Sequence, residues 1–353
     1  MGVGTILLRR GIILIFVLIA ILFLTAIIIG ASGYDTIILK AIVQQQIQAY
    51  KQAIQRRLVN ITEEEFTRMI EEYQATLEKS YGLDKPWYER VLPNVYRILT
   101  LNLGNATSED VCQVGGLTWP CKVADVVMAT LPRTIIMITV AELICAAIAL
   151  PIGPWIAYRR GSIADRIVVG YAALFNAVPV WWLGLVFIYV FSYNLGIAPT
   201  NFRGIISAIK EGSLVEILRY AWLPIVVVVI AFLGGWLYYT RSMVLRVITE
   251  DFVMVARAKG LPERLVVRRH IVRVAAPPIV TYTVLALASS IGGFIITESV
   301  FDWPGMGTLY YTAIMVGDAN TLIALIFITT VVYIAARFVL EILYVLLDPR
   351  VRL

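Results

Sequence analysis

The amino-acid sequence predicts an all-α protein that crosses a membrane six times. Of its 353 residues, 59% are hydrophobic and only 15% are charged, against about 25% charged residues in a typical soluble domain. The mean hydropathy is +0.81. The chain also contains uncharged or nearly uncharged runs of the roughly 20 residues that a helix needs to cross a bilayer. These observations exclude a disordered chain and an ordinary soluble enzyme.

The positions of the apolar runs define the six spans. The first run, 11–31, contains no charged residue. It is longer than the roughly 7–15 apolar residues of a signal peptide, so we expect it to be a retained membrane anchor. The other five spans are predicted at 132–158, 167–195, 220–240, 277–297 and 320–347.

The basic residues predict the orientation of these spans. Short cytoplasmic loops of membrane proteins are enriched in Lys and Arg. With the N-terminus inside, the inner loops contain Arg159, Arg160 and eight basic residues between Arg241 and Arg273. The short outer loops, one before span four and one at 298–319, contain only Arg203, Lys210 and Arg219. We therefore expect both termini in the cytoplasm. The net charge of +6 is accounted for by topology, and no nucleic-acid partner is expected.

The segment 32–131 is predicted to be extracellular and to begin with a helical hairpin. Val43, Ile47 and Ile54 recur near one helical face. A second helix is predicted to open at Thr62, because Glu65 follows at the spacing of a capping box. The sequence leaves open whether this hairpin only packs on itself or also presents a docking surface to an extracellular partner.

Cysteine and histidine usage bounds the chemistry of the chain. Cys112 and Cys121 lie in the same outer segment, where an oxidising environment favours a disulfide. The chain has one histidine and three cysteines. It lacks the GxxxxGK[ST] loop that cradles nucleotide phosphates and the HExxH motif of zinc proteases. We expect no metal site, no cofactor bound by this chain and no catalytic residue, which disfavours a membrane enzyme.

Three residues are candidates for contact with a transported molecule. Glu142 lies within the second span, where a carboxylate is costly and faces a cavity or a partner. The sequence leaves both burial in the bundle and contact with cargo open. Trp182 in the third span and Glu298 just after the fifth are weaker candidates. Trp303 is expected to anchor the outer interface.

The cytoplasmic loop 241–276 contains a short helical run ended by a turn. The run includes Ala256 and Ala258, and it stops at Gly260-Leu-Pro262. Spacing alone allows two interpretations. The loop is either a basic segment that fixes topology, or a short helix beneath the membrane that transmits movement to the spans.

This loop resembles the "EAA" loop of ABC-importer permeases of the dipeptide/oligopeptide branch, where Ala-Arg-Ala-Lys-Gly-Leu (256–261 here) is the usual wording. The loop differs from the general pattern at Met254, where the family has glutamate. The resemblance covers nearly all of the chain except about 35–78, which looks like an insertion. Further motifs match in order: Leu131–Thr134, Leu150–Gly153, Val178–Gly184, Glu298–Gly307 and Leu347–Arg350.

The resemblance implies a type I ABC-importer permease fold in the cell membrane. It implies that the chain pairs with a second homologous permease to form a pathway for di- and oligopeptides, delivered by an extracellular substrate-binding protein. Two ABC ATPase subunits would bind the ATP and Mg. The implied contacts with them are Glu250, Asp251, Val255, Ala256, Arg257, Ala258, Lys259 and Gly260. The alternatives are an importer of oligosaccharides and, more remotely, a stand-alone secondary transporter, which would not explain the 256–261 motif.

Overall fold

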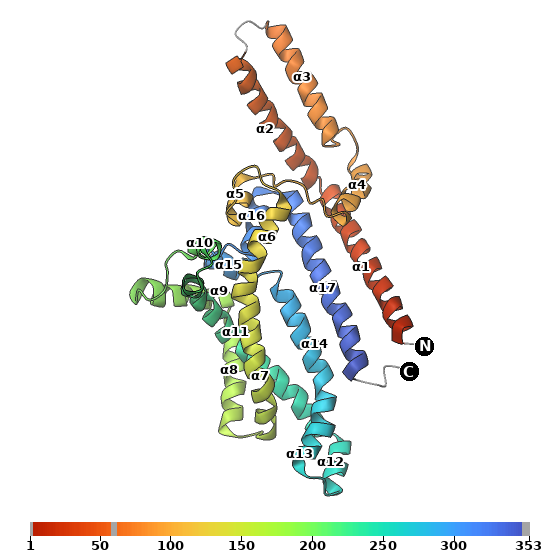
Figure 1. Cartoon of the computed structure of the whole chain (residues 1–353), viewed down its shortest axis with the longest axis vertical. Coiled ribbons are helices and arrows are strands. Elements are labelled where there is room, and N and C mark those ends of the chain that lie inside the picture. The colour runs from red at the N-terminus through yellow and green to blue at the C-terminus, as the bar shows by residue number, and fades with distance from the viewer. Residues whose placement is uncertain (1–2, 58–61, 348–353) are drawn as a thin grey trace.

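The computed structural model describes residues 3–57 and 62–347, and over these residues the chain is almost entirely helical (Figure 1). Within this part of the chain there is one isolated β-bridge, between Asn105 and Lys122, and no strand. Five helices are long and apolar enough to span a membrane, or six if a bent pair counts as one span. The predicted all-α, multi-span fold is confirmed. Residues 348–350 of the C-terminal motif lie outside the described residues.

Five spans are single or continuous helices, and several extend beyond their predicted limits. The helix α1 (Val3–Ala31) lies at one edge of the bundle, where Arg10 pairs with Glu341 of the last helix. The second span continues through a π-helical turn. The spans are α1, α6 (Val123–Thr134) with η1 (Ile135–Thr139) and α7 (Val140–Tyr158), α11 (Leu214–Ile248), α14 (Val272–Ser290) and α17 (Ala319–Leu347).

The third predicted span, 167–195, is a bent pair of helices. Helix α8 (Ile163–Ala177) and the helix formed by α9 (Val180–Phe187) with η2 (Ile188–Asn194) meet at 92°. The break occurs at Pro179, whose ring has no N–H to donate and disfavours a helical conformation in the residue before it. Val178 is accordingly extended, with φ −93° and ψ 121°.

The insertion is a helical hairpin that extends beyond the membrane bundle (Figure 1). Outer and inner denote the two sides of the membrane that the basic residues predict. It consists of α2 (Tyr34–Arg57) and α3 (Glu63–Ser80), and α4 (Trp87–Leu99) follows. The capping box of Thr62 and Glu65 is present. Val43 and Ile47 pack with Ile70 across the hairpin. The hairpin therefore buries an apolar seam of its own, as its spacing predicts.

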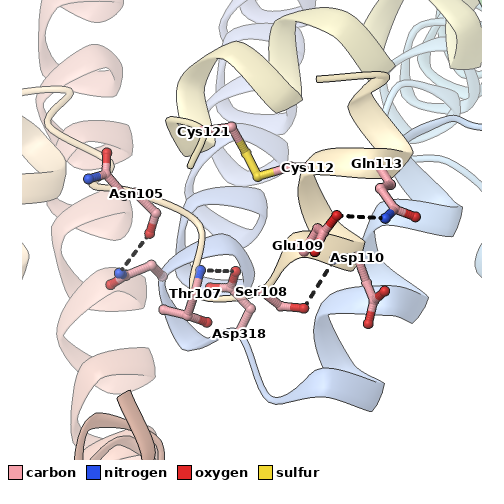
Figure 2. Close-up of a disulfide and its surroundings, with 10 residues drawn as sticks. Asn105, Thr107, Ser108, Glu109, Asp110, Cys112, Gln113, Cys121 and Asp318 are labelled. Carbon is pink, nitrogen blue, oxygen red and sulfur yellow. Dashed lines mark hydrogen bonds between the residues drawn. A yellow bond between two sulfur atoms is a disulfide. The ribbon is translucent and has the colours of Figure 1, made fainter. Parts of the chain in front are cut away.

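A second outer element, here called the outer cap, comprises residues 105–122 and lies beside the start of α17 (Figure 2). It contains α5 (Glu109–Gly115), and a disulfide joins Cys112 to Cys121 across a Cα–Cα distance of 5.9 Å. Asp318, just before α17, accepts a hydrogen bond from the Thr107 backbone N–H at 2.8 Å. The remaining short helices are η3 (Phe202–Gly204), α10 (Ile205–Glu211), α12 (Asp251–Ala258), α13 (Glu263–Val266), η4 (Val267–Ile271), α15 (Ile295–Val300) and α16 (Met306–Val316).

Candidate functional site

The loop that carries the 256–261 motif folds as a helix and a tight turn. Helix α12 begins after Glu250 and ends at Ala258. Gly260 then adopts φ +71°, a left-handed conformation that residues with a side chain rarely adopt. Pro262 starts α13, which leads through η4 into α14. In Figure 1, α12 and α13 lie at the opposite end of the molecule from the α2–α3 hairpin.

One face of α12 is fixed to the transmembrane bundle. Val253 and Ala256 are buried in an apolar cluster that includes Ala157 of α7 and Ile271 of η4. The cluster also includes Val244 of α11 and Ala275 of α14, so this packing joins the loop to the inner ends of three spans. A displacement of α12 therefore acts directly on all three, because close-packed side chains leave little room for independent movement.

The turn after α12 is braced by an ion pair. The Nη2 atom of Arg257 lies 2.7 Å from Oε1 of Glu263, and Nε donates to Oε2 at 3.2 Å. The paired carboxylate raises the pKa of Arg257 above its ordinary value. Tyr158 at the end of α7 makes a smaller contribution to the same pKa shift. The helix, the turn and the start of α13 are thus connected as one unit.

The opposite face of α12 exposes the apolar side chains of Met254 and Val255, which are 64% and 51% exposed. Phe252 is 40% exposed and lies one turn before the buried Ala256, so it borders the packed face. Exposed apolar side chains that lie together are typical of a protein contact. Of the eight predicted coupling residues, Ala256 faces inward and the other seven are exposed. Sequence reasoning missed Phe252 and Met254, although the inward positions Val253 and Ala256 fix which face points outward.

A second ion pair braces the inner end of the bundle, and sequence reasoning did not identify it. The Asp165 carboxylate of α8 accepts a hydrogen bond from Nη2 of Arg241 in α11 at 3.0 Å. It accepts another from the backbone N–H of Gly161 at 2.8 Å. Both charged side chains are nearly buried. Because Arg241 lies ten residues before Asp251 on the same chain segment, this pair secures the helix from which α12 emerges.

Glu298 is an internal structural group in this chain. Its side chain is completely buried. One carboxylate oxygen accepts from the Thr134 hydroxyl at 3.2 Å and the Phe294 N–H at 3.3 Å, and the other from the N–H groups of Gly307 and Thr308 at 2.9 and 3.3 Å. The carboxylate thus satisfies the open N-terminus of α16. Burial raises the pKa of Glu298 to about 7, against the opposing effect of these donors.

Glu298 therefore binds groups of its own chain, and its contact with a pathway stays a prediction. The expectation that Trp303 anchors the membrane interface is wrong. Trp303 is fully buried, and its indole N–H donates to the Arg133 carbonyl at 3.0 Å. The Arg133 side chain in turn donates to the carbonyls of Val114, Gly115 and Pro304. Two motifs that lie far apart in the sequence, 131–134 and 298–307, thus bind each other at the outer end of the second span.

Glu142 and Trp182 lie in different surroundings from Glu298. Glu142 is 7% exposed and accepts a hydrogen bond at 2.6 Å from the indole N–H of Trp236 in α11. The Trp236 ring also packs edge-on against Tyr282 of α14. Trp182 is about half exposed and follows directly after the bend at Pro179. The structure does not bring the three pathway candidates together in one site.

Comparison with known proteins agrees with the features of the fold and the inner loop. The family model described as "Binding-protein-dependent transport system inner membrane component" matches residues 149–353. This range begins near the inner end of the second span and includes α12. It covers the four later spans and both inner ion pairs.

Individual relatives cover more of the chain. The oligopeptide transport system permease protein AppB of Bacillus subtilis is 30% identical over 273 residues, which are 77% of this chain and 83% of that protein. The di/tripeptide transport system permease protein DppB of Pseudomonas aeruginosa is 31% identical over 77% of this chain and 82% of its own length. The Escherichia coli dipeptide permease protein DppB is 27% identical over 80% and 86%.

The family match extends over more than half of the chain, and the apolar helices of the structure agree with the membrane location that the family name gives. The chain therefore belongs to the family of binding-protein-dependent transport system inner membrane components, and is a multi-pass permease of the cell membrane.

Proposed function

We propose that this chain is one of two permease subunits of an ATP-driven importer of di- and oligopeptides. In this proposal the second permease is a homologue, and the two together enclose the translocation pathway. An extracellular substrate-binding protein delivers the peptide. Two ATPase subunits on the cytoplasmic side bind ATP and Mg, and this chain binds neither and performs no catalysis.

The observation that carries this proposal is the construction of α12. The helix exposes Phe252, Met254 and Val255 while Val253 and Ala256 fix it to the spans. A helix that is apolar on both faces has one face for its own bundle and one for a partner. An ATPase subunit gripping the exposed face would move the inner ends of α7, α11 and α14 together.

The peptide cargo is proposed from the names of the relatives, which are permeases for oligopeptides, dipeptides and tripeptides. An importer of oligosaccharides remains the alternative and would use the same coupling loop. Measuring which ligand the partner binding protein retains, a peptide mixture or an oligosaccharide mixture, separates the two cargoes. A stand-alone secondary transporter has no use for a partner-binding face on α12.

Substitution of Gly260 tests the coupling role. A Cβ at this position meets no atom within 4 Å, so the effect of a side chain is confined to the backbone conformation. Gly260→Val places a β-branched residue at φ +71°, at a cost of more than about 1–2 kcal/mol, and the turn rearranges. We expect the reconstituted complex to hydrolyse ATP without transport.

The matched control is Gly260→Asn, because asparagine tolerates the left-handed conformation. This variant is expected to keep transport coupled to ATP hydrolysis. Both quantities are measured on the complete transporter in proteoliposomes, with cargo-loaded binding protein present. Unchanged transport per ATP in Gly260→Val would contradict the coupling role of this turn.

A further inference from the structure

Helix α4, which follows the outer insertion, has three distinct faces. Val91, Val95 and Ile98 are buried in the apolar core beside α1. The second face, here called the apolar stripe, comprises side chains that recur every three or four residues and are between 41% and 69% exposed: Tyr88, Leu92, Tyr96 and Leu99. Exposure of such an apolar face to water is unfavourable, so we expect another apolar surface to cover it.

The position of α4 identifies what covers the apolar stripe. The helix packs against the outer end of α1 (Figure 1), where the Trp87 ring lies against Gly30. In the membrane-spanning part of α1, only 11% of residues are buried within the chain. Exposed Leu24, Ile27 and Ile28 mark the outer end of that helix. The apolar stripe continues this lipid-facing surface at the depth where tyrosine is enriched in membrane proteins.

The third face of α4 forms one wall of a cavity of about 780 Å³, here called the basic cavity. Its other walls come from α2, the turn after α3, the 104–107 segment and the start of α17. The charged side chains that line it are four basic residues and one acidic residue: Lys79, Lys85, Arg90, Arg97 and Glu89. This lining favours an anionic occupant.

Arg97 gives the most specific indication of an anion. Its side chain is only partly buried and lines the basic cavity. The Nη2 atom donates to the Asn320 side-chain oxygen at 3.0 Å, which holds the guanidinium in place. A guanidinium fixed at the wall of a cavity is well suited to a phosphate oxygen, which it binds through charge-assisted hydrogen bonds.

We propose that α4 lies in the outer membrane interface and that the basic cavity binds the phosphate of an anionic phospholipid, with the acyl chains along the apolar stripe. The lipid satisfies the apolar stripe and the basic lining together. An acidic segment of a partner protein would satisfy only the charge. This inference uses the membrane location of the chain and does not depend on the cargo or on the ATPase partners.

Lipid retention tests the charge component. The complete transporter is purified from vesicles of phosphatidylglycerol mixed with phosphatidylcholine, and bound lipid is counted by native mass spectrometry. We expect wild-type protein to retain phosphatidylglycerol selectively. Arg97→Ala should weaken retention about tenfold, the effect of losing one charge-assisted hydrogen bond. Arg219→Ala removes an exposed basic side chain outside the cavity and should change nothing.

A second pair of variants guards against misfolding at Arg97. Lys79 and Lys85 are exposed, so Lys79→Ala with Lys85→Ala should fold normally and still reduce retention of phosphatidylglycerol. Equal retention of both lipids by wild type and variants would overturn the proposal. Binding of inorganic phosphate with no preference for the lipid would assign the basic cavity to free phosphate and would overturn the lipid assignment.

Fluorescence quenching tests the apolar component. A polarity-sensitive label is placed at Leu92→Cys in the complete transporter, and at Arg68→Cys on the exposed surface of α3 as the matched control. Nitroxide-bearing acyl chains should quench the label at position 92 and leave the label at position 68 unchanged, while aqueous iodide should do the reverse. Strong iodide quenching at position 92 would place it in water. Protection from both quenchers would place it under a protein partner. Either result overturns the proposal.

Discussion

At the scale of single residues, two of the buried carboxylates, Glu298 and Glu142, differ in what surrounds them. Glu298 accepts hydrogen bonds from three backbone N–H groups and one hydroxyl. Glu142 accepts from the indole of Trp236. Backbone donors cannot turn away or rotate to become acceptors. The site around Glu298 therefore requires an acceptor at both oxygen positions, whereas the site around Glu142 requires one.

This difference predicts opposite responses to the same substitution. Glu298→Gln presents an amide NH₂ to at least one backbone N–H, and leaves that donor buried without an acceptor. We expect a loss of about 1–3 kcal/mol in the free energy of unfolding. Glu142→Gln keeps an oxygen for Trp236 and should cost much less. Thermal unfolding of the purified protein in detergent measures both. Equal destabilisation by the two variants would contradict this account of Glu298.

The residue scale is also where sequence reasoning had least success. Trp303 was expected at the membrane interface because tryptophan is enriched there, but it is buried and bonded to the Arg133 carbonyl. The prediction rested on residue type, and no local pattern records a partner 170 positions away. The same limit applies to Asp165 and Arg241. Each is an ordinary charged residue in its own segment, and only packing of α8 against α11 pairs them.

At the scale of elements, local chemistry predicted helices well and their continuity less well. The capping box at Thr62 and the turn at Gly260 both form where their residues indicate. These features depend on contacts within a few residues. The bend at Pro179 carried an equally local signal, since proline disfavours a helical residue before it. The high apolarity of 167–195 predicts a span, but hydropathy gives no information about whether the helix axis changes direction within it.

The α12 turn predicts a measurable but small pairwise energy. Arg257 and Glu263 are 40% and 51% exposed, so water screens their attraction. A double-mutant cycle with Arg257→Ala and Glu263→Ala should give a coupling energy of roughly 0.2–1 kcal/mol in the free energy of unfolding. Because the pair connects α12 to α13, each single variant should also lower the amount of cargo transported per ATP, even though it changes the free energy of unfolding little. If the effects of the two variants on the free energy of unfolding are additive and transport per ATP is unchanged, the pair does not brace the turn.

At the scale of the whole molecule, the outer cap and the inner loop lie at opposite ends of the bundle (Figure 1). The disulfide between Cys112 and Cys121 stabilises the outer cap by restricting the unfolded chain. For a loop of this size the chain-entropy model gives about 2–3 kcal/mol. The Cys112→Ser, Cys121→Ser double variant should unfold at a lower temperature than the wild type, and reductant should lower the unfolding temperature of the wild type only. Cys145 is buried and forms no disulfide. It is present in both proteins, so a response to reductant that only the wild type shows comes from the Cys112–Cys121 bond.

The whole-molecule assembly is the level that a single sequence determines least. The resemblance of the 256–261 motif predicted which segment contacts a partner, and the structure gives that segment an exposed apolar face. The pathway could not be predicted in the same way. In the proposed assembly its walls depend on a second subunit, and Glu142, Trp182 and Glu298 lie in separate environments in this chain.

Crosslinking from the exposed face of α12 tests the central claim most directly. In the complete transporter, a photoreactive group attached at Val255→Cys should crosslink to an ATP-binding subunit, and the yield should change when ATP binds. The same group at Arg68→Cys, on α3 at the opposite end of the molecule, should not. A Val255 position that reacts with membrane-impermeant reagents from outside the cell, or that crosslinks to no ATP-binding subunit, would contradict the account.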